Sequence, residues 1–366
     1  DCDVGDELLL DDGRVVMRVE GKNDEELHCR VLIGGPLSDH KGINRRGGGL
    51  TAPALTEKDK ADIKLAASMD LDYVAVSFPR DAKDMEYARS LLTEAGGTAW
   101  LVAKIERAEA VADDEALDGL IRASDAVMVA RGDLGVEIGD AELVGIQKKI
   151  ILHARRYNKA VITATQMMES MIHNPMPTRA EVSDVANAVL DYTDAVMLSA
   201  ESAAGEYPVE AVKAMARICA GAEKHPTTKK SSHRIGQTFE RCDESIALAT
   251  MYTANHFPGI KAIICLTESG YTPLIMSRIR SSVPIFAYSP HRETQARVAL
   301  FRGVETIPFD PAALPPERVS QEAVDALLQR GVVTKGDWVI LTKGDSYTTQ
   351  GGTNTMKVLH VGDLLA

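Results

Sequence analysis

Two apolar stretches, WLVAKIE at residues 100–106 and AVMVARGDLG at residues 126–135, decide the fold class of this sequence. Similar apolar runs lie at residues 73–78, 160–165 and 195–199, with helix-compatible segments between them. Short, near-continuously apolar strands that alternate with helices are typical of a parallel sheet covered on both faces. The sequence therefore predicts the α/β class, with the βα spacing of a barrel or of a doubly wound sheet.

The first fifty residues differ in pattern from the rest. Apolar runs at residues 8–10, 15–19 and 27–33 are separated by turn residues, and a Gly- and Arg-rich loop follows at residues 44–49. Strands joined by short turns are typical of β-hairpins. Residues 1–50 are therefore predicted to form a small β-rich domain.

Helix and linker signals give the remaining domain boundaries. Thr56-Glu57-Lys58-Asp59 has the sequence of a helix cap, which predicts a helix to about residue 69. Polar residues 221–240 indicate a linker. We therefore expect a barrel-type domain at residues 51–225 and a separate α/β domain at residues 226–366.

The last domain shows its own alternation of strands and helices. Strands are predicted at residues 262–266, 285–288, 338–341 and 356–361, and helices from about 243, from 273, and at 292–300 and 316–330.

Composition excludes several classes of function. The 366 residues carry a net charge of -12, which argues against a nucleic-acid-binding surface and means that an anionic substrate needs local cations. The five cysteines are scattered without a Cys-x-x-Cys pair, which fits a reducing cytoplasm. Because no apolar run is long enough to cross a bilayer, no membrane partner is expected. The acidic start lacks Met, so we expect the chain to begin partway through a longer protein.

Lys104 and Glu106 are the sharpest candidates for chemistry. They lie two residues apart on a predicted strand, so their side chains face the same way. If the strand is buried on both faces, these charged side chains need either interaction partners or a functional role. The structural alternatives are a solvent-exposed strand face or a simple ion pair.

Asp133 follows the next strand, with Gly132 beside it. A glycine allows the backbone to approach a ligand closely. Glu106 and Asp133 together offer hard oxygen ligands suited to Mg²⁺ or Mn²⁺, which bind few protein carboxylates and share the oxygens of a substrate. Asp133 alone could equally shape a turn or cap a helix.

Thr165 ends the strand at residues 160–165 and is a candidate to hold an oxyanion or relay a proton, although a threonine at a strand end is usually structural. Ser199 is a weaker case of the same kind. The methionine-rich stretch at residues 167–171 is expected to serve packing or a subunit interface.

Three ordered strings in the sequence resemble the pyruvate kinases. They are KIE at residues 104–106, MVARGDLGVE at residues 128–137, and TATQMMESM at residues 163–171, which PTRAEVSDVAN follows at residues 177–187. The resemblance implies a TIM-type (β/α)8 barrel with a β-rich cap and a C-terminal regulatory α/β domain. It implies a cytoplasmic glycolytic enzyme that transfers a phosphoryl group from phosphoenolpyruvate to ADP, giving pyruvate and ATP.

The resemblance also implies roles for the candidate residues. Glu106 and Asp133 would bind Mg²⁺ or Mn²⁺, and Lys104 would neutralise the phosphoryl group in transfer. Gly132, Asp133 and Thr165 would bind the substrate carboxylate, with Thr165 helping to protonate the enolate. A homotetramer and a phosphorylated allosteric activator are implied as well.

Only five of the eight βα units of a closed barrel are visible, so three more are expected upstream of residue 1. Those strands would carry the K⁺ ligands and further phosphate contacts. One alternative is therefore a catalytically incomplete fragment that acts only as a phosphometabolite-binding module. Another is a different barrel enzyme of phosphoenolpyruvate or 2-oxo acid chemistry.

The activator site is expected where a strand of the last domain meets a helix. Thr272 is predicted as the helix N-cap and Pro273 as the first helical residue. The resemblance places a phosphate-binding loop at Thr267, Ser269, Gly270, Tyr271 and Thr272. Residues 344–354, with Ser346, Tyr347, Thr348 and Thr349, would form the facing wall, and Lys343 would be a nearby cation. A plain capped loop is the alternative.

Overall fold

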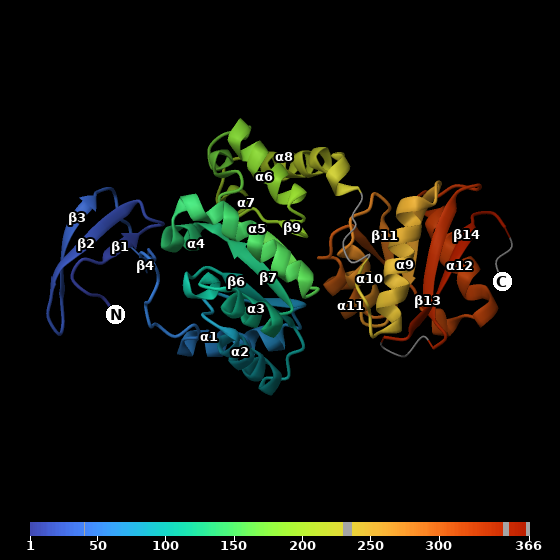
Figure 1. Ribbon diagram of the computed structural model, residues 1–366, viewed down its shortest axis with the longest axis horizontal. Helices are drawn as coiled ribbons and strands as arrows, with labels where there is room; N and C mark the ends of the chain where they lie inside the picture. The colour runs from blue at the N-terminus through green and yellow to red at the C-terminus, as the bar shows by residue number, and fades with distance from the viewer. Residues whose placement is uncertain (40, 230–235, 347–350, 364–366) are drawn as a thin grey trace. The chain divides into compact units, whose positions relative to one another are not determined.

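The computed structural model describes residues 1–39, 41–229, 236–346 and 351–363. The chain divides into two compact units, Asp1–Ala216 and Arg217–Ala366 (Figure 1). The finer predicted boundaries, at residues 50 and 225, stay predictions. No helix among the described residues is long and apolar enough to span a bilayer.

The first fifty residues form a four-stranded antiparallel sheet, the cap. Its strands are β1 (Glu7–Leu10), β2 (Val15–Lys22), β3 (Leu27–Ile33) and β4 (Ile43–Arg45), in the order β3-β2-β1-β4. The three predicted strands are confirmed. The prediction of a loop from residue 44 was wrong at its start, because Ile43 and Arg45 pair with Leu10 and Leu8 of β1.

A parallel sheet forms the centre of the first unit. Its strands run in chain order: β5 (Tyr73–Val76), β6 (Trp100–Ile105), β7 (Ala126–Ala130), β8 (Ala160–Ala164) and β9 (Ala195–Val196). Each of the five strands was predicted. Strands that add in one direction without reversal follow a barrel, whereas a doubly wound sheet reverses its order. The sequence alone left these two possibilities open.

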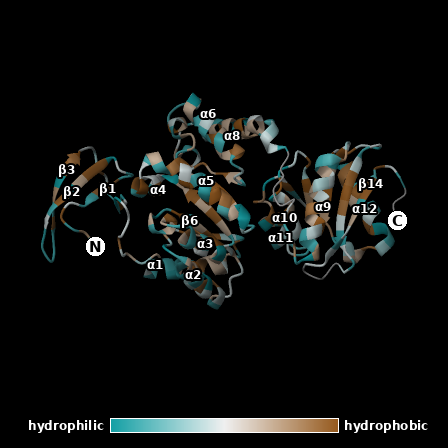
Figure 2. Ribbon diagram, in the orientation of Figure 1, coloured by the Kyte–Doolittle hydropathy of each residue, from teal (hydrophilic) through white to brown (hydrophobic). Residues whose placement is uncertain are grey.

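Helices precede, connect and follow these strands, and buried apolar side chains of the first five helices pack against the sheet. They are α1 (Glu57–Ser68), α2 (Ala82–Glu94), α3 (Asp114–Ala123), α4 (Arg131–Ile138), α5 (Asp140–Arg156), α6 (Arg179–Leu190), α7 (Ala200–Ala203) and α8 (Pro208–Ala222). Hydrophobic residues concentrate on strands such as β6, while hydrophilic residues lie on helices such as α2 (Figure 2). The predicted cap of α1 is confirmed, since Thr56 and Asp59 form a reciprocal capping box.

The second unit is a separate five-stranded sheet in the order β12-β11-β10-β13-β14. Its strands are β10 (Ile260–Leu266), β11 (Ile285–Ser289), β12 (Val304–Pro308), β13 (Trp338–Gly344) and β14 (Thr353–His360), and its helices are α9 (Cys242–His256), α10 (Tyr271–Ser277), α11 (Arg292–Val298) and α12 (Pro316–Gln329). Only the pair β13–β14 is antiparallel. The strand order reverses between β10 and β13, which is typical of a doubly wound sheet.

Strand β12 was not predicted. It lies at the sheet edge, carries Glu305 within it and ends at Pro308, so its sequence lacks the continuous apolar run of the central strands. The predicted linker also begins later than expected, because α8 continues to Ala222.

The two tryptophans of the chain fall in different units. Trp100 lies on β6, where its ring meets the edge of Tyr73 with centroids 5.8 Å apart. Trp338 lies on β13 between Phe257, at 5.6 Å, and His360, at 4.8 Å. Each unit therefore has one tryptophan inside an aromatic cluster.

Candidate active site

Lys104 and Glu106 form the centre of the site at the carboxyl end of β6. The Lys104 ammonium lies 2.6 Å from Glu106 Oε1, and the Glu106 side chain is 1% exposed. The expected common direction of the two side chains is confirmed. The ion pair that the sequence left as an alternative is also present, so the structure holds a buried carboxylate with one adjacent cation.

Burial sets the protonation behaviour of Glu106. Removal from water raises the pKa of its carboxyl, and Lys104 and the Phe78 amide oppose that rise. The charge of Asp133 raises the pKa further. The two carboxylates therefore interact electrostatically, as neighbouring ligands of one cation would.

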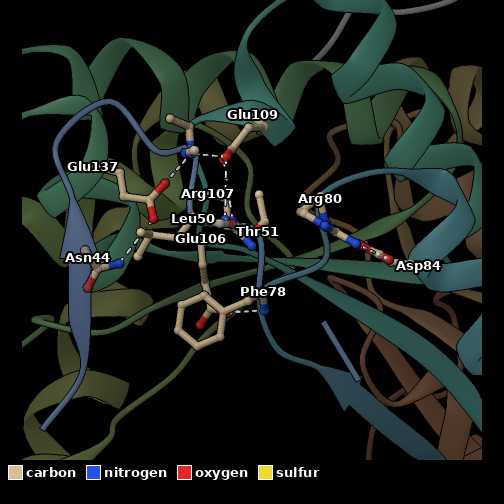
Figure 3. Close-up of polar contacts among 12 residues, drawn as sticks. Asn44, Leu50, Thr51, Phe78, Arg80, Asp84, Glu106, Arg107, Glu109 and Glu137 are labelled. Atoms are coloured by element: carbon tan, nitrogen blue, oxygen red, sulfur yellow. Dashed lines mark hydrogen bonds and ion pairs between the residues drawn. The ribbon is translucent and has the colours of Figure 1, made fainter. Parts of the chain in front are cut away.

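The loop after β5 contributes two partners that the sequence analysis missed. The backbone N–H of Phe78 donates to Glu106 Oε2 at 2.7 Å (Figure 3), and Lys104 donates to Ser77 Oγ at 3.1 Å. Phe78 has φ +54°, an unusual backbone conformation for a residue with a Cβ. Little in the sequence indicates these two partners, because the only polar residue there is one serine after an apolar run.

Asp133 lies in the first turn of α4, which begins directly after β7. The predicted position of Asp133, just past a strand end, agrees with the structure, which shows in addition that a helix begins there, at Arg131. Burial raises the pKa of the Asp133 carboxyl, Asp12 from the cap raises it further, and Lys104 lowers it. A turn of the cap therefore contributes negative charge to the same site.

The residues present fit a divalent cation. Glu106 Oε1 is buried and accepts no hydrogen bond of good geometry from the described residues, although Lys104 lies beside it. Asp133, Ser77 and Phe78 line a hollow of about 640 Å³. Among the described residues no group of three or more His, Cys, Asp or Glu side chains could hold a metal ion. Two carboxylates and an open side suit Mg²⁺, which retains water or substrate oxygens as ligands.

Gly132 and Thr165, to which the resemblance assigns a common substrate carboxylate, lie in direct contact. The Gly132 N–H donates to Thr165 Oγ1 at 2.8 Å, and this hydroxyl donates to the Ala164 carbonyl at 2.7 Å. The methionines after Thr165 are packing residues as expected, since Met167, Met168 and Met171 are fully buried.

A second polar cluster, between the cap and the barrel, was not predicted. Glu137 is 4% exposed; its Oε2 accepts from the Ala108 N–H at 2.7 Å and its Oε1 from Asn44 Nδ2 at 3.2 Å (Figure 3). Burial raises the pKa of the Glu137 carboxyl. Nearby, Arg107 donates to the Leu50 carbonyl. These contacts fix the chain segment that leaves the cap.

Four of the five expected activator residues, all except Gly270, line a small pocket in the second unit. Its volume is about 30 Å³, and its walls include Thr267, Ser269, Tyr271 and Thr272 on one side and Gly344, Ser346 and residues 351–353 on the other. The pocket lies at the carboxyl ends of β10 and β13, where the strand order reverses. Such switch points are the usual ligand sites of open α/β sheets. Tyr347, Thr348 and Thr349 lie outside the described residues.

The predicted cap of α10 was wrong. The N-cap is Gly270, which has φ +80°, and the helix begins at Tyr271. Thr272 is buried inside the first turn, and its hydroxyl pairs with that of Thr353 at 2.9 Å. A glycine is needed at the cap because a Cβ on Gly270 would lie 2.4 Å from Val298. Gly270 also donates its N–H to Thr267 Oγ1 at 3.0 Å, which closes the loop on itself.

Comparison with known protein families gives two matches. Residues 1–212 match the model described as the barrel domain of pyruvate kinase, and residues 244–359 match the model of its alpha/beta domain. The first match alone covers more than half of the chain.

Individual proteins are similar over the same length. Pyruvate kinase II of Salmonella typhimurium is 59% identical over 357 residues, which cover 98% of this chain and 74% of that protein. A pyruvate kinase of Haemophilus influenzae is 57% identical with the same coverage. A pyruvate kinase of Geobacillus stearothermophilus is 41% identical over 370 residues, covering 100% of this chain and 62% of that protein.

Proposed function

The chain belongs to the pyruvate kinase family, and from this membership we propose that Lys104, Glu106, Asp133 and Thr165 carry its phosphoryl-transfer chemistry. Its function is the transfer of a phosphoryl group from phosphoenolpyruvate to ADP, giving pyruvate and ATP in glycolysis. The alternative of a mere binding module is not favoured, because the family match includes the barrel domain with its candidate residues.

We propose that Glu106 and Asp133 hold the divalent cation, Mg²⁺ or Mn²⁺. When bound, the cation would supply positive charge that stabilises the negative charge of the phosphoryl group in transfer. Glu106 suits this role because it is buried and is already oriented by the Phe78 N–H, and because its Oε1 accepts no hydrogen bond of good geometry from the described residues, although the Lys104 ammonium lies beside it. The family is also generally dependent on K⁺, for which we assign no ligand among these residues.

Lys104 has the position of a charge-neutralising group. Its ammonium contacts Glu106 and Ser77, and the Lys104 side chain is 26% exposed. A compact point charge suits the equatorial oxygens of a phosphoryl group in transfer, which needs positioning and charge rather than a covalent intermediate. We propose that Lys104 moves from Glu106 toward the phosphoryl group as substrate and cation bind.

Thr165 and the first turn of α4 form the other side of the site. We propose that backbone groups of Gly132 and Asp133, with the Thr165 hydroxyl, bind the substrate carboxylate. The contact between Gly132 N and Thr165 Oγ1 supports this, since it brings a backbone donor and a hydroxyl to one point. From there Thr165 would help to protonate the enolate that the departing phosphoryl group leaves behind.

The single observation that carries this proposal is the buried Glu106 with Lys104 beside it and Asp133 within electrostatic reach. The test is Lys104→Met in the complete protein that carries this chain. Turnover should fall by about 10²–10³-fold, while Mn²⁺ and phosphoenolpyruvate still bind. The matched control is Lys64→Met, at an exposed position on α1. Near-parental turnover in Lys104→Met would refute the assignment.

We propose further that the pocket around Thr267, Ser269, Gly270, Tyr271 and Thr272 binds a phosphorylated activator. Hydroxyls and backbone N–H groups at a strand-order reversal support an anionic ligand. By family membership we also propose a homotetramer located in the cytoplasm, where phosphoenolpyruvate and ADP occur.

A further inference from the structure

The turn after β8 has a backbone conformation that its residues disfavour. Thr165 has φ +62° and Gln166 has φ +52°, and neither residue is a glycine. Side chains with a Cβ rarely adopt the left-handed region, and two consecutive cases persist only when the surroundings impose them. The question is therefore which contact imposes this conformation beside a proposed substrate-binding hydroxyl.

The guanidinium of Arg131 contacts the backbone at this turn. Its Nη2 donates to the Thr165 carbonyl at 2.7 Å, and its Nε lies 3.2 Å from the carbonyls of both Ala164 and Thr165. Its Nη1 donates to Asp184 Oδ2 at 2.6 Å, and the Arg131 side chain is only 7% exposed. A planar, multidentate donor can hold two successive carbonyls at once, which a lysine ammonium does less well.

The neighbour of Arg131 holds the side chain of the same threonine. Gly132 donates its backbone N–H to Thr165 Oγ1 at 2.8 Å. The first turn of α4 thus contacts Thr165 twice, once at its carbonyl through Arg131 and once at its hydroxyl through Gly132. If the turn relaxed to a right-handed conformation, both contacts would change together.

We propose that Arg131 is a positioning residue that keeps Thr165 and Gln166 in the left-handed conformation and so directs the Thr165 hydroxyl toward the substrate. This inference rests on the proposed role of Thr165. Arg131 does not touch the reacting groups; it acts through the backbone of the turn, and Asp184 orients the guanidinium from α6.

The test compares Arg131→Met with the double variant Arg131→Met plus Gln166→Gly. Arg131→Met should lower kcat by about 10²-fold and, because the Thr165 hydroxyl is also proposed to bind the substrate carboxylate, should raise the KM for phosphoenolpyruvate. Glycine adopts positive φ without strain, so Gln166→Gly should restore about tenfold of the lost kcat. If Arg131 served only packing, Gln166→Gly, 35 positions later in the sequence, would not restore the kcat that Arg131→Met loses. Arg122→Met, on the exposed side of α3, is the matched control.

Amide exchange at Gly132 gives a readout that does not depend on activity. Its exchange rate should rise in Arg131→Met and return toward the parental rate in the double variant, because the bond to Thr165 Oγ1 reports the conformation of the turn. If Arg131→Met does not fold, Arg131→Lys is measured in the same way, with intermediate effects expected.

Parental kcat and parental Gly132 exchange in a folded Arg131 variant would overturn the inference, and so would absence of rescue by Gln166→Gly. Thr165→Ala separates this result from the proposed function. If Thr165→Ala keeps parental kcat, the catalytic role of Thr165 is wrong, while the exchange data still decide whether Arg131 holds the turn.

Discussion

Glu106 shows how position changes the chemistry of an ordinary side chain. Its carboxyl is removed from water, which favours the neutral form, yet Lys104 and the Phe78 N–H favour the charged form. Burial is the largest of these influences, so the pKa is raised. A bound divalent cation would reverse that balance, because it favours the carboxylate more strongly than a single ammonium does.

Loss of either proposed metal ligand should weaken cation binding directly. Glu106→Gln and Asp133→Asn should each lower the affinity for Mn²⁺ by at least about tenfold, measured by titration calorimetry or by electron paramagnetic resonance of free Mn²⁺. The control is Glu115→Gln, at an exposed position in the first turn of α3. Parental affinity in both site variants would remove the metal assignment.

At the scale of single residues, the sequence identifies candidate site residues only where neighbouring positions in the chain reveal their placement. Lys104 and Glu106 were found because spacing on a strand fixes direction. Glu137 and Arg131 were missed because their roles come from distant partners: Asn44 lies 93 residues from Glu137, and Asp184 lies 53 residues from Arg131. No periodicity in one sequence reports such contacts.

Helix α4 and strand β4 are joined through one buried carboxylate. Glu137 binds the β4 residue Asn44 through its side chain, and its carbonyl accepts from the Gly47 N–H at 2.9 Å. The same helix carries Gly132 and Asp133 at its other end. The cap is thereby attached to the element that presents two of the proposed substrate-binding residues.

The raised pKa of Glu137 gives a pH-dependent stability with a defined sign. The folded protein binds the proton of Glu137 more tightly than the unfolded chain does, so this group lowers stability as pH rises from its ordinary value of 4.5 through the raised value. Glu137→Gln abolishes that titration. The stability of the variant relative to the parent should therefore increase from about pH 4.5 toward neutrality.

Urea unfolding at several pH values measures this difference. A glutamine can still accept from Ala108 and can donate to Asn44 if that amide turns over. Glu142→Gln, exposed on α5, should show no comparable trend. A constant stability difference between Glu137→Gln and the parent across this range would contradict the expectation.

Helices and strands were predicted well where the sequence contains an apolar run or a capping motif. Strands that form only because a neighbouring strand pairs with them were predicted poorly. The barrel strands and the capping box of α1 belong to the first kind. Strands β4 and β12 belong to the second, because each lies at a sheet edge and its neighbour supplies the pairing. The predicted cap of α10 at Thr272 was wrong, because the close contact with Val298, which leaves no room for a Cβ at Gly270, is not visible in the sequence.

At the scale of the whole chain, two compact units carry two different candidate sites. The proposed phosphoryl-transfer residues lie in the first unit, and the hydroxyl-rich pocket lies in the second. A ligand stabilises the part of the protein to which it binds, by about 2.7 kcal/mol at a hundred times its dissociation constant. The two sites can therefore be distinguished by which unit each ligand stabilises.

Calorimetry with separate ligands tests this division. Mn²⁺ with phosphoenolpyruvate should raise the unfolding temperature of the first unit, and a sugar phosphate or nucleotide that binds the proposed activator pocket should raise that of the second. Ser269→Asp places a negative charge in the proposed activator pocket and should abolish only the second shift. Identical shifts in the parent and in Ser269→Asp would remove the pocket as the activator site.

Because Trp100 and Trp338 lie in separate aromatic clusters, the tryptophan fluorescence of each unit can be measured separately. Excitation of indole in a Trp338→Phe variant reports only the strand that bears Lys104, and in Trp100→Phe it reports only the sheet that borders the proposed activator pocket. Emission wavelength and lifetime can thus follow each unit through a single intrinsic fluorophore, without any attached dye.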